Sequence, residues 1–172
     1  MNREAATENL LEAKSILDTL GVQFWLTCGT LLGYYREGTF IEHDNDIDLG
    51  AFIAQDRPEI IPSFKMAGWT HYHTFGTPKS GLEYAFVKNG IKVDLFFHYR
   101  DRENYWMGVW KRGKLRKYVF PIFELREVEW LDTRFLVPTN TEAFLERHYG
   151  KDWRTPKKKW DYFTSPRSIQ GG

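Results

Sequence analysis

Residues 28–49 read Cys28-Gly-Thr-Leu-Leu-Gly-Tyr-Tyr-Arg-Glu-Gly-Thr-Phe-Ile-Glu-His-Asp-Asn-Asp-Ile-Asp-Leu49. The stretch opens with a Gly-Thr turn at the end of an apolar strand expected over residues 22–28. It closes with three carboxylates at alternate positions, Asp44, Asp46 and Asp48. Side chains two apart in a strand share a face, so Asp46 and Asp48 point the same way from the strand expected over residues 45–52. Because like charges this close repel each other, the stretch predicts a cation between them.

A further acid stands alone in a later apolar strand, residues 91–97. Asp94 lies on the face opposite Val93 and Leu95, where a carboxylate is costly unless it is paired or bound to a metal. If this strand lies beside residues 45–52, Asp46, Asp48 and Asp94 form one cluster. Oxygen ligands of this kind suit Mg²⁺ or Mn²⁺. One Asp-x-Asp alone is more often a solvated strand face or a helix cap, and it is the combination that favours a metal site.

Composition limits the class of protein. The chain has 172 residues, 42% of them hydrophobic, which fits one globular domain. Lys and Arg total 24 against 23 for Asp and Glu, so no nucleic-acid partner is expected. The single cysteine forms no internal disulfide. Neither a membrane span nor a secretory signal is expected, which predicts a cytoplasmic protein. The oligomeric state stays open.

The order of predicted elements is mixed. Helices are expected over residues 3–20, 31–37, 58–67 and 140–149, with Thr30 capping the second and Asp56 the third. Strands are expected over residues 22–28, 45–52, 69–75, 82–87, 91–97, 106–112, 115–120, 128–131 and 134–137. The predicted fold is α/β (an α+β mixed sheet) in a single domain, residues 1–156. Residues 157–172 are expected to form a basic and aromatic tail, and the chain from Lys151 onward is expected to lie extended over the surface.

The turn, the Asp pair and the distant third Asp together match the site of nucleotidyltransferases of the DNA-polymerase-beta type. In such a site the turn offers backbone N–H groups and a hydroxyl to phosphate at a helix N-terminus. The acids hold one or two metal ions, which assist the attacking and leaving oxygens. This match predicts a nucleotidyltransferase (DNA-polymerase-beta-like) fold, with phosphoryl transfer as the chemistry.

Four blocks of the chain carry a more specific pattern: Gly29-Thr-Leu-Leu-Gly-Tyr-Tyr-Arg36 with Gly38-x-Phe-Ile41, Asp44-Asn-Asp-Ile-Asp48, Val93-Asp-Leu-Phe96, and Val137-Pro…Phe144-Leu-Glu-x-x-Tyr-Gly-x-x-Trp153-x-Thr-Pro156. These blocks resemble the LicD family of bacterial phosphocholine transferases and of the fukutin and fukutin-related ribitol-phosphate transferases. Glu42-His43 stands where the family often has Pro-Trp, and Asn45 where it often has Asp. Neither departure removes a predicted metal ligand, so they bear on the substrate more than on the mechanism.

The resemblance implies a reaction and roles for named residues. A phospho-alcohol, either phosphocholine or a polyol phosphate, moves from a CDP-linked donor to a hydroxyl of a glycan or glycolipid, and CMP is released. Asp46, Asp48 and Asp94 are the implied catalytic metal ligands. Gly29 and Thr30 are implied contacts of the donor phosphate, with Arg36 as a further contact. Asp44 and His43 are expected to orient the site or touch the substrate.

Two other functions remain open from the sequence. The same acids serve a nucleotidyltransferase that moves NMP from an NTP to a small molecule, protein or RNA. A non-catalytic nucleotide-binding module of the same fold is the other. Two basic segments also have two possible roles: each is either a solvated surface or a region that attracts phosphate groups. The first is the cluster Lys111, Arg112, Lys114, Arg116 and Lys117, and the second is Lys157–Lys159 with Trp160. His71, His73 and His98 are expected to be ordinary histidines, not zinc ligands.

Overall fold

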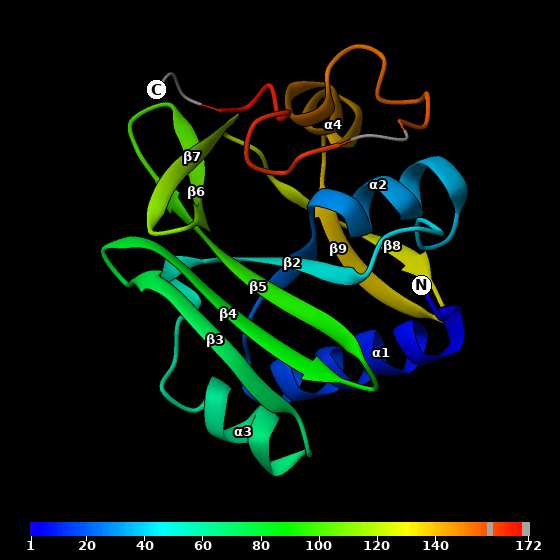
Figure 1. Ribbon diagram of the computed structural model, residues 1–172, viewed down its shortest axis with the longest axis vertical. Coiled ribbons are helices and arrows are strands. Elements are labelled where there is room, and N and C mark those ends of the chain that lie inside the picture. The colour runs from blue at the N-terminus through cyan, green and yellow to red at the C-terminus, as the bar shows by residue number, and fades with distance from the viewer. Residues whose placement is uncertain (158–159, 170–172) are drawn as a thin grey trace.

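The computed structural model describes residues 1–157 and 160–169, and a mixed sheet lies at its centre (Figure 1). In these residues the sheet has seven strands, in the order β1 (Phe24–Leu26), β2 (Asp46–Phe52), β5 (Ile91–Arg100), β4 (Ser80–Lys88) and β3 (Thr70–Thr77). From β5 the sheet continues into a hairpin of β6 (Asn104–Lys111) and β7 (Lys114–Pro121). The strands β2 and β5 are parallel, and the other neighbours in this sheet are antiparallel. A second hairpin pairs β8 (Leu125–Trp130) with β9 (Thr133–Pro138).

Helices cover both sides of the sheet (Figure 1). The helices α1 (Arg3–Thr19) and α3 (Ile60–Met66) lie on one side, and α2 (Cys28–Glu37) and α4 (Thr141–Tyr149) lie on the other. A short 3-10 turn, η1 (Ile53–Gln55), follows β2. No helix in residues 1–157 and 160–169 is long and apolar enough to cross a membrane. The predicted α/β class and mixed sheet are therefore confirmed.

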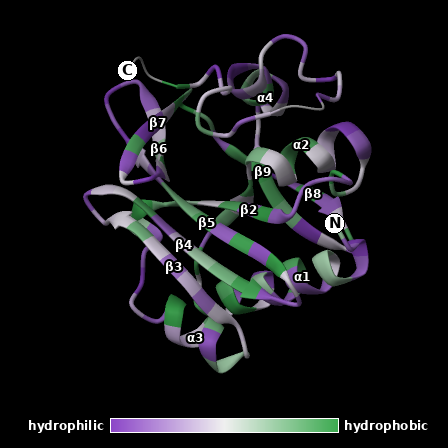
Figure 2. Ribbon diagram, viewed as in Figure 1, coloured by the Kyte–Doolittle hydropathy of each residue, from purple (hydrophilic) through white to green (hydrophobic). Residues whose placement is uncertain are grey.

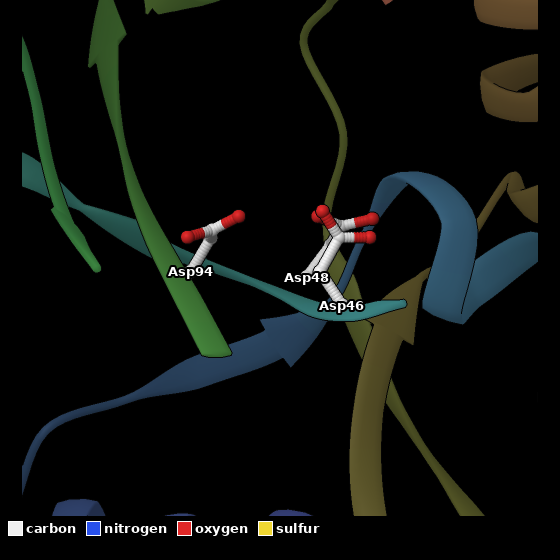
Figure 3. A group of neighbouring side chains, drawn as sticks. All are labelled: Asp46, Asp48 and Asp94. Carbon is white, nitrogen blue, oxygen red and sulfur yellow. The ribbon is translucent and has the colours of Figure 1, made fainter. Parts of the chain in front are cut away.

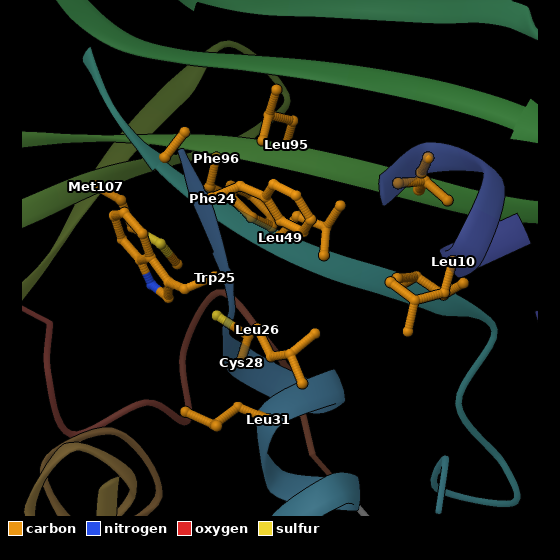
Figure 4. Packing of buried hydrophobic residues seen from close by; sticks show 14 of the residues in the cluster. Leu10, Phe24, Trp25, Leu26, Cys28, Leu31, Leu49, Leu95, Phe96 and Met107 are labelled. Carbon is orange, nitrogen blue, oxygen red and sulfur yellow. The ribbon is translucent and has the colours of Figure 1, made fainter. Parts of the chain in front are cut away.

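Alternation along β2 and β5 decides which side is core. Ile47, Leu49, Val93 and Leu95 are buried toward α1 and α3, whereas the acids between them point to the other side. Figure 2 shows this alternation of hydrophobic and hydrophilic residues along β5. At the junction of β1 and α2 the core continues through Leu26, Cys28 and Leu31 (Figure 4). A packed core therefore supports the strands that carry the acids.

Two predicted helix caps are wrong. The helix α2 begins at Cys28, so Thr30 lies inside its first turn, and Thr27 occupies the N-cap position. The hydroxyl of Thr30 instead accepts a hydrogen bond from the Asp48 N–H at 2.8 Å. The helix α3 begins at Ile60 after Glu59, and Asp56 accepts a hydrogen bond from the Tyr84 hydroxyl at 2.8 Å. In both cases the side chain that local preference predicts as a helix cap forms a hydrogen bond with a residue distant in sequence instead.

The segment after Lys157 does not lie extended over the surface in the part that the structure describes, residues 160–169. Ser168 accepts a hydrogen bond from the Val119 N–H at 2.8 Å, and the Arg167 N–H donates to the His148 carbonyl at 2.8 Å. Phe163 and Ser168 are buried. Backbone pairing with β7 and burial of Phe163 therefore hold this segment against β7 and α4. The predicted basic residues Lys158 and Lys159 lie outside the described residues.

Candidate active site

Three carboxylates meet on the two parallel strands. In the register of β2 and β5, Asp48 stands opposite Asp94 and Asp46 stands opposite Lys92. One carboxylate oxygen from each of Asp46, Asp48 and Asp94 lies within 4.8 Å of the others. Figure 3 shows the three side chains rising from the same side of the strands. The predicted adjacency of these strands, and with it the predicted cluster, is confirmed.

A lysine that the sequence analysis missed lies among these acids. Lys92 Nζ is 2.6 Å from Asp94 Oδ2 and 3.3 Å from Asp46 Oδ2. Burial acts to lower the pKa of Lys92, but Asp94 and Asp46 outweigh it, so the side chain stays charged. The sequence did contain a signal for this lysine: it lies two residues before Asp94, so the two side chains share a face of the strand. One ammonium still leaves an excess of negative charge.

The acids remain incompletely satisfied within the described residues. Asp94 is only 2% exposed, and its Oδ1 atom has no hydrogen-bond partner there. Burial raises the pKa of Asp94 to about 6, although Lys92 opposes it. Burial raises the pKa of Asp48 well above its usual range, with further contributions from Asp46 and Asp44. Three converging carboxylates with an unpartnered oxygen fit a hard divalent cation such as Mg²⁺ or Mn²⁺.

The start of α2 is tied directly to this cluster. The Gly29 N–H donates to Asp48 Oδ2 at 2.8 Å, and the Thr27 N–H donates to the Asp48 carbonyl at 3.2 Å. A Cβ atom at residue 29 would overlap Asp44 Oδ2 and would lie 3.1 Å from Asp48 Oδ2. Glycine is therefore required for this close approach. Thr30 is buried behind the helix start, where its hydroxyl accepts a hydrogen bond from the Asp48 backbone N–H.

Two cavities adjoin at the cluster. The larger, about 340 Å³, contains the three acids together with Lys92. The smaller, about 250 Å³, contains the predicted site residues Arg36 and His43. Four residues line both cavities: Gly29, Asp44, Tyr149 and Trp160. The structure therefore brings seven of the eight predicted site residues to these cavities, and Thr30 lines neither of them.

The smaller cavity combines cations with aromatic rings. Arg36 donates to the Trp153 carbonyl at 3.2 Å and pairs with Glu37. Lys157 Nζ lies 5.5 Å from the centroid of the Trp160 ring, and it donates to the Tyr149 carbonyl at 3.2 Å. Tyr149 and Trp160 have ring centroids 4.8 Å apart. Positive charge beside aromatic faces suits an anionic ligand that carries a planar ring.

Asp44 lies where the two cavities meet. Burial, followed by a hydrogen bond with Asp46, raises the pKa of Asp44 to about 7. Its carboxylate accepts from the Asn45 N–H at 3.1 Å. Asp44 is therefore connected to the cluster through Asp46.

The sequence analysis also missed Glu83 and Tyr118. Glu83 in β4 is 5% exposed and lines the larger cavity, and burial followed by the charge of Asp94 raises its pKa well above the usual range. The Tyr118 hydroxyl is buried in the wall of the same cavity without a hydrogen-bond partner in the described residues. Glu83 is an acid in an apolar strand, which is the same pattern that singled out Asp94. Nothing in the local sequence of Tyr118 indicated its role.

The basic cluster on the β6–β7 hairpin packs against other side chains and does not line the candidate active site. Lys111 pairs with Asp161 at 2.8 Å, Arg116 lies 4.8 Å from the Phe163 ring centroid, and Lys117 lies 4.2 Å from that of Trp106. None of the cluster's five residues lines the two cavities. These contacts hold the C-terminal segment on the hairpin. Of the predicted histidines, His98 is buried in the core among Trp25, Phe120 and Phe123.

Comparison with known proteins identifies relatives of this chain. The mouse ribitol-5-phosphate transferase FKTN is 42% identical over 171 residues, which are 98% of this chain and 37% of that protein. Human FKTN is 41% identical over the same shares. An uncharacterized Caenorhabditis elegans protein is 29% identical over 96% of this chain and 47% of its own length. The chain thus spans less than half the length of these curated relatives.

A solved structure and a family model complete the comparison. The antibiotic-resistance factor ANT(2'')-Ia matches with a TM-score of 0.50 at 14% identity, over 96% of this chain and 83% of that one, which is a likeness of fold. The model "LicD/FKTN/FKRP, nucleotidyltransferase domain" matches residues 21–140, a range that includes all three clustered acids. This chain therefore belongs to the LicD/FKTN/FKRP family and carries its nucleotidyltransferase domain.

Proposed function

We propose that this chain transfers a phospho-alcohol from a CDP-linked donor to a glycan hydroxyl and releases CMP. A polyol phosphate such as ribitol 5-phosphate is the first candidate because relatives at 41–42% identity are named ribitol-5-phosphate transferases; phosphocholine is the second. The observation that supports the chemistry best is the Asp46, Asp48 and Asp94 cluster, which lies in a cavity at the start of α2.

The proposed reaction is a displacement at the distal phosphorus of the donor. The acceptor oxygen forms a bond to this phosphorus, the bond to the bridging oxygen breaks, and CMP leaves with that oxygen and the electron pair. Asp94 Oδ1, buried and without a partner in the described residues, is suited to take the proton of the attacking hydroxyl.

Asp46, Asp48 and Asp94 would hold Mg²⁺ or Mn²⁺, which would supply charge neutralisation at the phosphates and acidify the attacking hydroxyl. The chain's own residues would position both substrates. The Gly29 N–H holds one oxygen of the Asp48 carboxylate, and the Asp48 backbone N–H donates to the Thr30 hydroxyl. The partial positive charge at the N-terminus of α2 favours a phosphate nearby.

The smaller cavity is the proposed site of the CMP portion of the donor. It has Arg36 and Lys157 for phosphate charge, the His43 ring for a hydrogen bond, and the Trp160 ring for the base. Gly29 and Asp44 line both cavities, so a donor bound in the smaller cavity would extend its distal phosphate toward the acids. This placement supports transfer of the distal phosphoryl group because the metal ligands lie in the second cavity, beyond the CMP.

The test is a comparison of released products. The protein is incubated with Mg²⁺ and either CDP-ribitol, CDP-choline or each NTP, with a glycoside panel as acceptors, and CMP and pyrophosphate are quantified. We expect CMP from a CDP-alcohol, no pyrophosphate, and no product after addition of EDTA or in the Asp48→Asn variant. Pyrophosphate release would replace the proposal with nucleotidyl transfer. Mg²⁺ binding without either product would replace it with a non-catalytic nucleotide-binding module.

A further inference from the structure

We infer that the part of the larger cavity beyond the acids, formed by Phe75, Glu83, Trp110 and Tyr162, binds the terminal, uncharged sugar ring of the acceptor. In this subsite the Glu83 carboxylate accepts a hydrogen bond from a sugar hydroxyl, and the three aromatic side chains contact the ring. The inference rests on the proposed function, because it names the acceptor class of the same site.

The register of the sheet places Glu83 next to the cluster. On the acidic face, Phe75 of β3, Glu83 of β4 and Phe96 of β5 form one row across three strands. The next row brings Ala85 opposite Asp94. Diagonal neighbours of this kind are separated by roughly 7–8 Å. A sugar ring held by Glu83 is therefore within reach of the proposed reaction centre.

Two polar groups in this cavity lack protein partners among the described residues. The Glu83 carboxylate takes part in no hydrogen bond or ion pair there, although the residue is 5% exposed. The buried Tyr118 hydroxyl is also without a partner. Burying a polar group without a hydrogen bond costs free energy, so these groups are expected to find partners on a ligand. Sugar hydroxyls both donate and accept, and they match a carboxylate together with a phenol.

Two of the three aromatic side chains, Trp110 and Tyr162, have protein contacts in the absence of a ligand. Trp110 Nε1 donates to the Gly81 carbonyl at 2.9 Å, which fixes the indole. Tyr162 is 50% exposed, and Lys111 Nζ lies 5.1 Å from its ring centroid while pairing with Asp161. Rigid aromatic rings bury the apolar face of a ligand at a low cost in conformational entropy. The three rings thus form a wall that suits the C–H face of a sugar.

The ionisable groups that line the larger cavity bear on the charge of the acceptor. The larger cavity is lined by five carboxylates and by Lys92, which is paired with two of them: Asp44, Asp46, Asp48, Glu83 and Asp94. Among the described residues that line it, the other basic group is the His148 ring, whose pKa burial lowers to about 3, so this ring is neutral. Arg36, His43 and Lys157 line the smaller cavity instead. An acceptor end that bears phosphate or carboxylate would bring a further negative charge into this buried, acid-lined space, whereas a neutral ring would not.

The experiment measures acceptor binding separately from donor binding. Wild type, Glu83→Gln and Tyr162→Ala are titrated by saturation-transfer NMR with p-nitrophenyl glycosides of galactose, glucose, xylose, N-acetylgalactosamine, N-acetylglucosamine and glucuronic acid, with Mg²⁺ present. CMP binding is measured in the same samples by calorimetry. The matched control for Tyr162→Ala is Tyr72→Ala, which removes a tyrosine that is 65% exposed and lines neither cavity.

We expect at least one neutral glycoside to bind wild type in the millimolar range or tighter, and the glucuronide to bind more weakly than the glucoside. In Glu83→Gln and Tyr162→Ala the affinity for the neutral glycoside should fall at least tenfold while CMP affinity changes less than twofold. No binding of any neutral glycoside, or unchanged affinity in both variants, would overturn the subsite. Failure of the transferase proposal has another readout, the absence of CMP release from both CDP-alcohols by wild type.

Discussion

The backbone N–H of Gly29 donates a hydrogen bond to Asp48 Oδ2 at 2.8 Å. This contact joins the first turn of α2 to the strand that carries the proposed metal ligands. A Cβ atom at residue 29 would overlap Asp44 Oδ2 and lie only 3.1 Å from Asp48 Oδ2, so a side chain there would displace these carboxylates. The geometry of the site therefore depends on a residue that contributes no functional group.

Gly29→Ala should separate site geometry from stability. The added methyl overlaps Asp44 Oδ2, the end of a side chain that can move, and alanine is about 1 kcal/mol better than glycine inside a helix. We expect an unchanged or higher urea midpoint but at least tenfold weaker Mn²⁺ binding by calorimetry, because Asp44 and Asp48 are displaced. Gly33→Ala is the matched control, since its methyl would lie 2.6 Å from the Thr39 backbone oxygen and should lower the midpoint. Wild-type Mn²⁺ affinity in Gly29→Ala would contradict the argument.

Lys92→Met should make the folded state depend more on a divalent cation. Lys92 Nζ contacts Asp94 at 2.6 Å, so its removal leaves a buried carboxylate without its cation. We expect a lower melting temperature in EDTA, and a larger increase on addition of MnCl₂ than wild type shows. The control is Lys88→Met, which breaks an ion pair of equal length with Glu12 far from the acids. An equal response of both variants to MnCl₂ would exclude the special role of Lys92.

Asp94→Asn should stop transfer while CMP still binds. The amide keeps the shape of the side chain but neither accepts the proton nor ligates a cation as a carboxylate does. We expect CMP release from a CDP-alcohol to fall by about 10²–10⁴-fold, as for loss of a general base. Stability should hold or rise, because burial already disfavours the charged form of Asp94. Undiminished turnover with raised stability would make Asp94 a structural residue only.

Much of the site was predictable because its pattern is local. Asp46 and Asp48 share a strand face by simple alternation, and Asp94 stood out as an acid in an apolar strand. Lys92 and Glu83 follow equally simple patterns, but their importance depends on which strands are neighbours and in which register. Strand pairing is a long-range property, and β2 and β5 are parallel partners separated by two other strands in sequence. Glu83 could be identified as a site residue only once β4 was known to lie beside β5.

The errors have a related cause. Thr30 and Asp56 both have the side chains of helix caps, yet each is bonded to a distant strand instead. Residues 160–169 are rich in polar groups, and only Phe163 and the backbone pairing with Val119 show why they pack. Local propensity predicted the existence of these elements better than their ends.

His98 should make stability sensitive to acid. Burial lowers its pKa to about 4, whereas an unfolded histidine has a pKa near 6.5. Between these values the unfolded chain binds more protons than the folded one, so stability rises with pH. The contribution of the neutral His98 ring to the free energy of unfolding is complete above about pH 6.5 and is lost as pH falls toward 4. Between pH 7.5 and pH 5 this loss amounts to about 2 kcal/mol.

The measurement is urea unfolding of wild type and His98→Phe at pH 7.5 and pH 5, in EDTA. Asp44 and Asp94 titrate in the opposite sense, because their pKa values are raised in the folded state, so the total pH dependence of wild type alone is not diagnostic. The difference between the two proteins isolates His98, since the acids are common to both. Phenylalanine keeps a ring beside Trp25, whose ring centroid lies 4.8 Å from that of His98. We expect the variant to gain about 2 kcal/mol relative to wild type on going to pH 5, and parallel losses in both proteins would contradict the assignment.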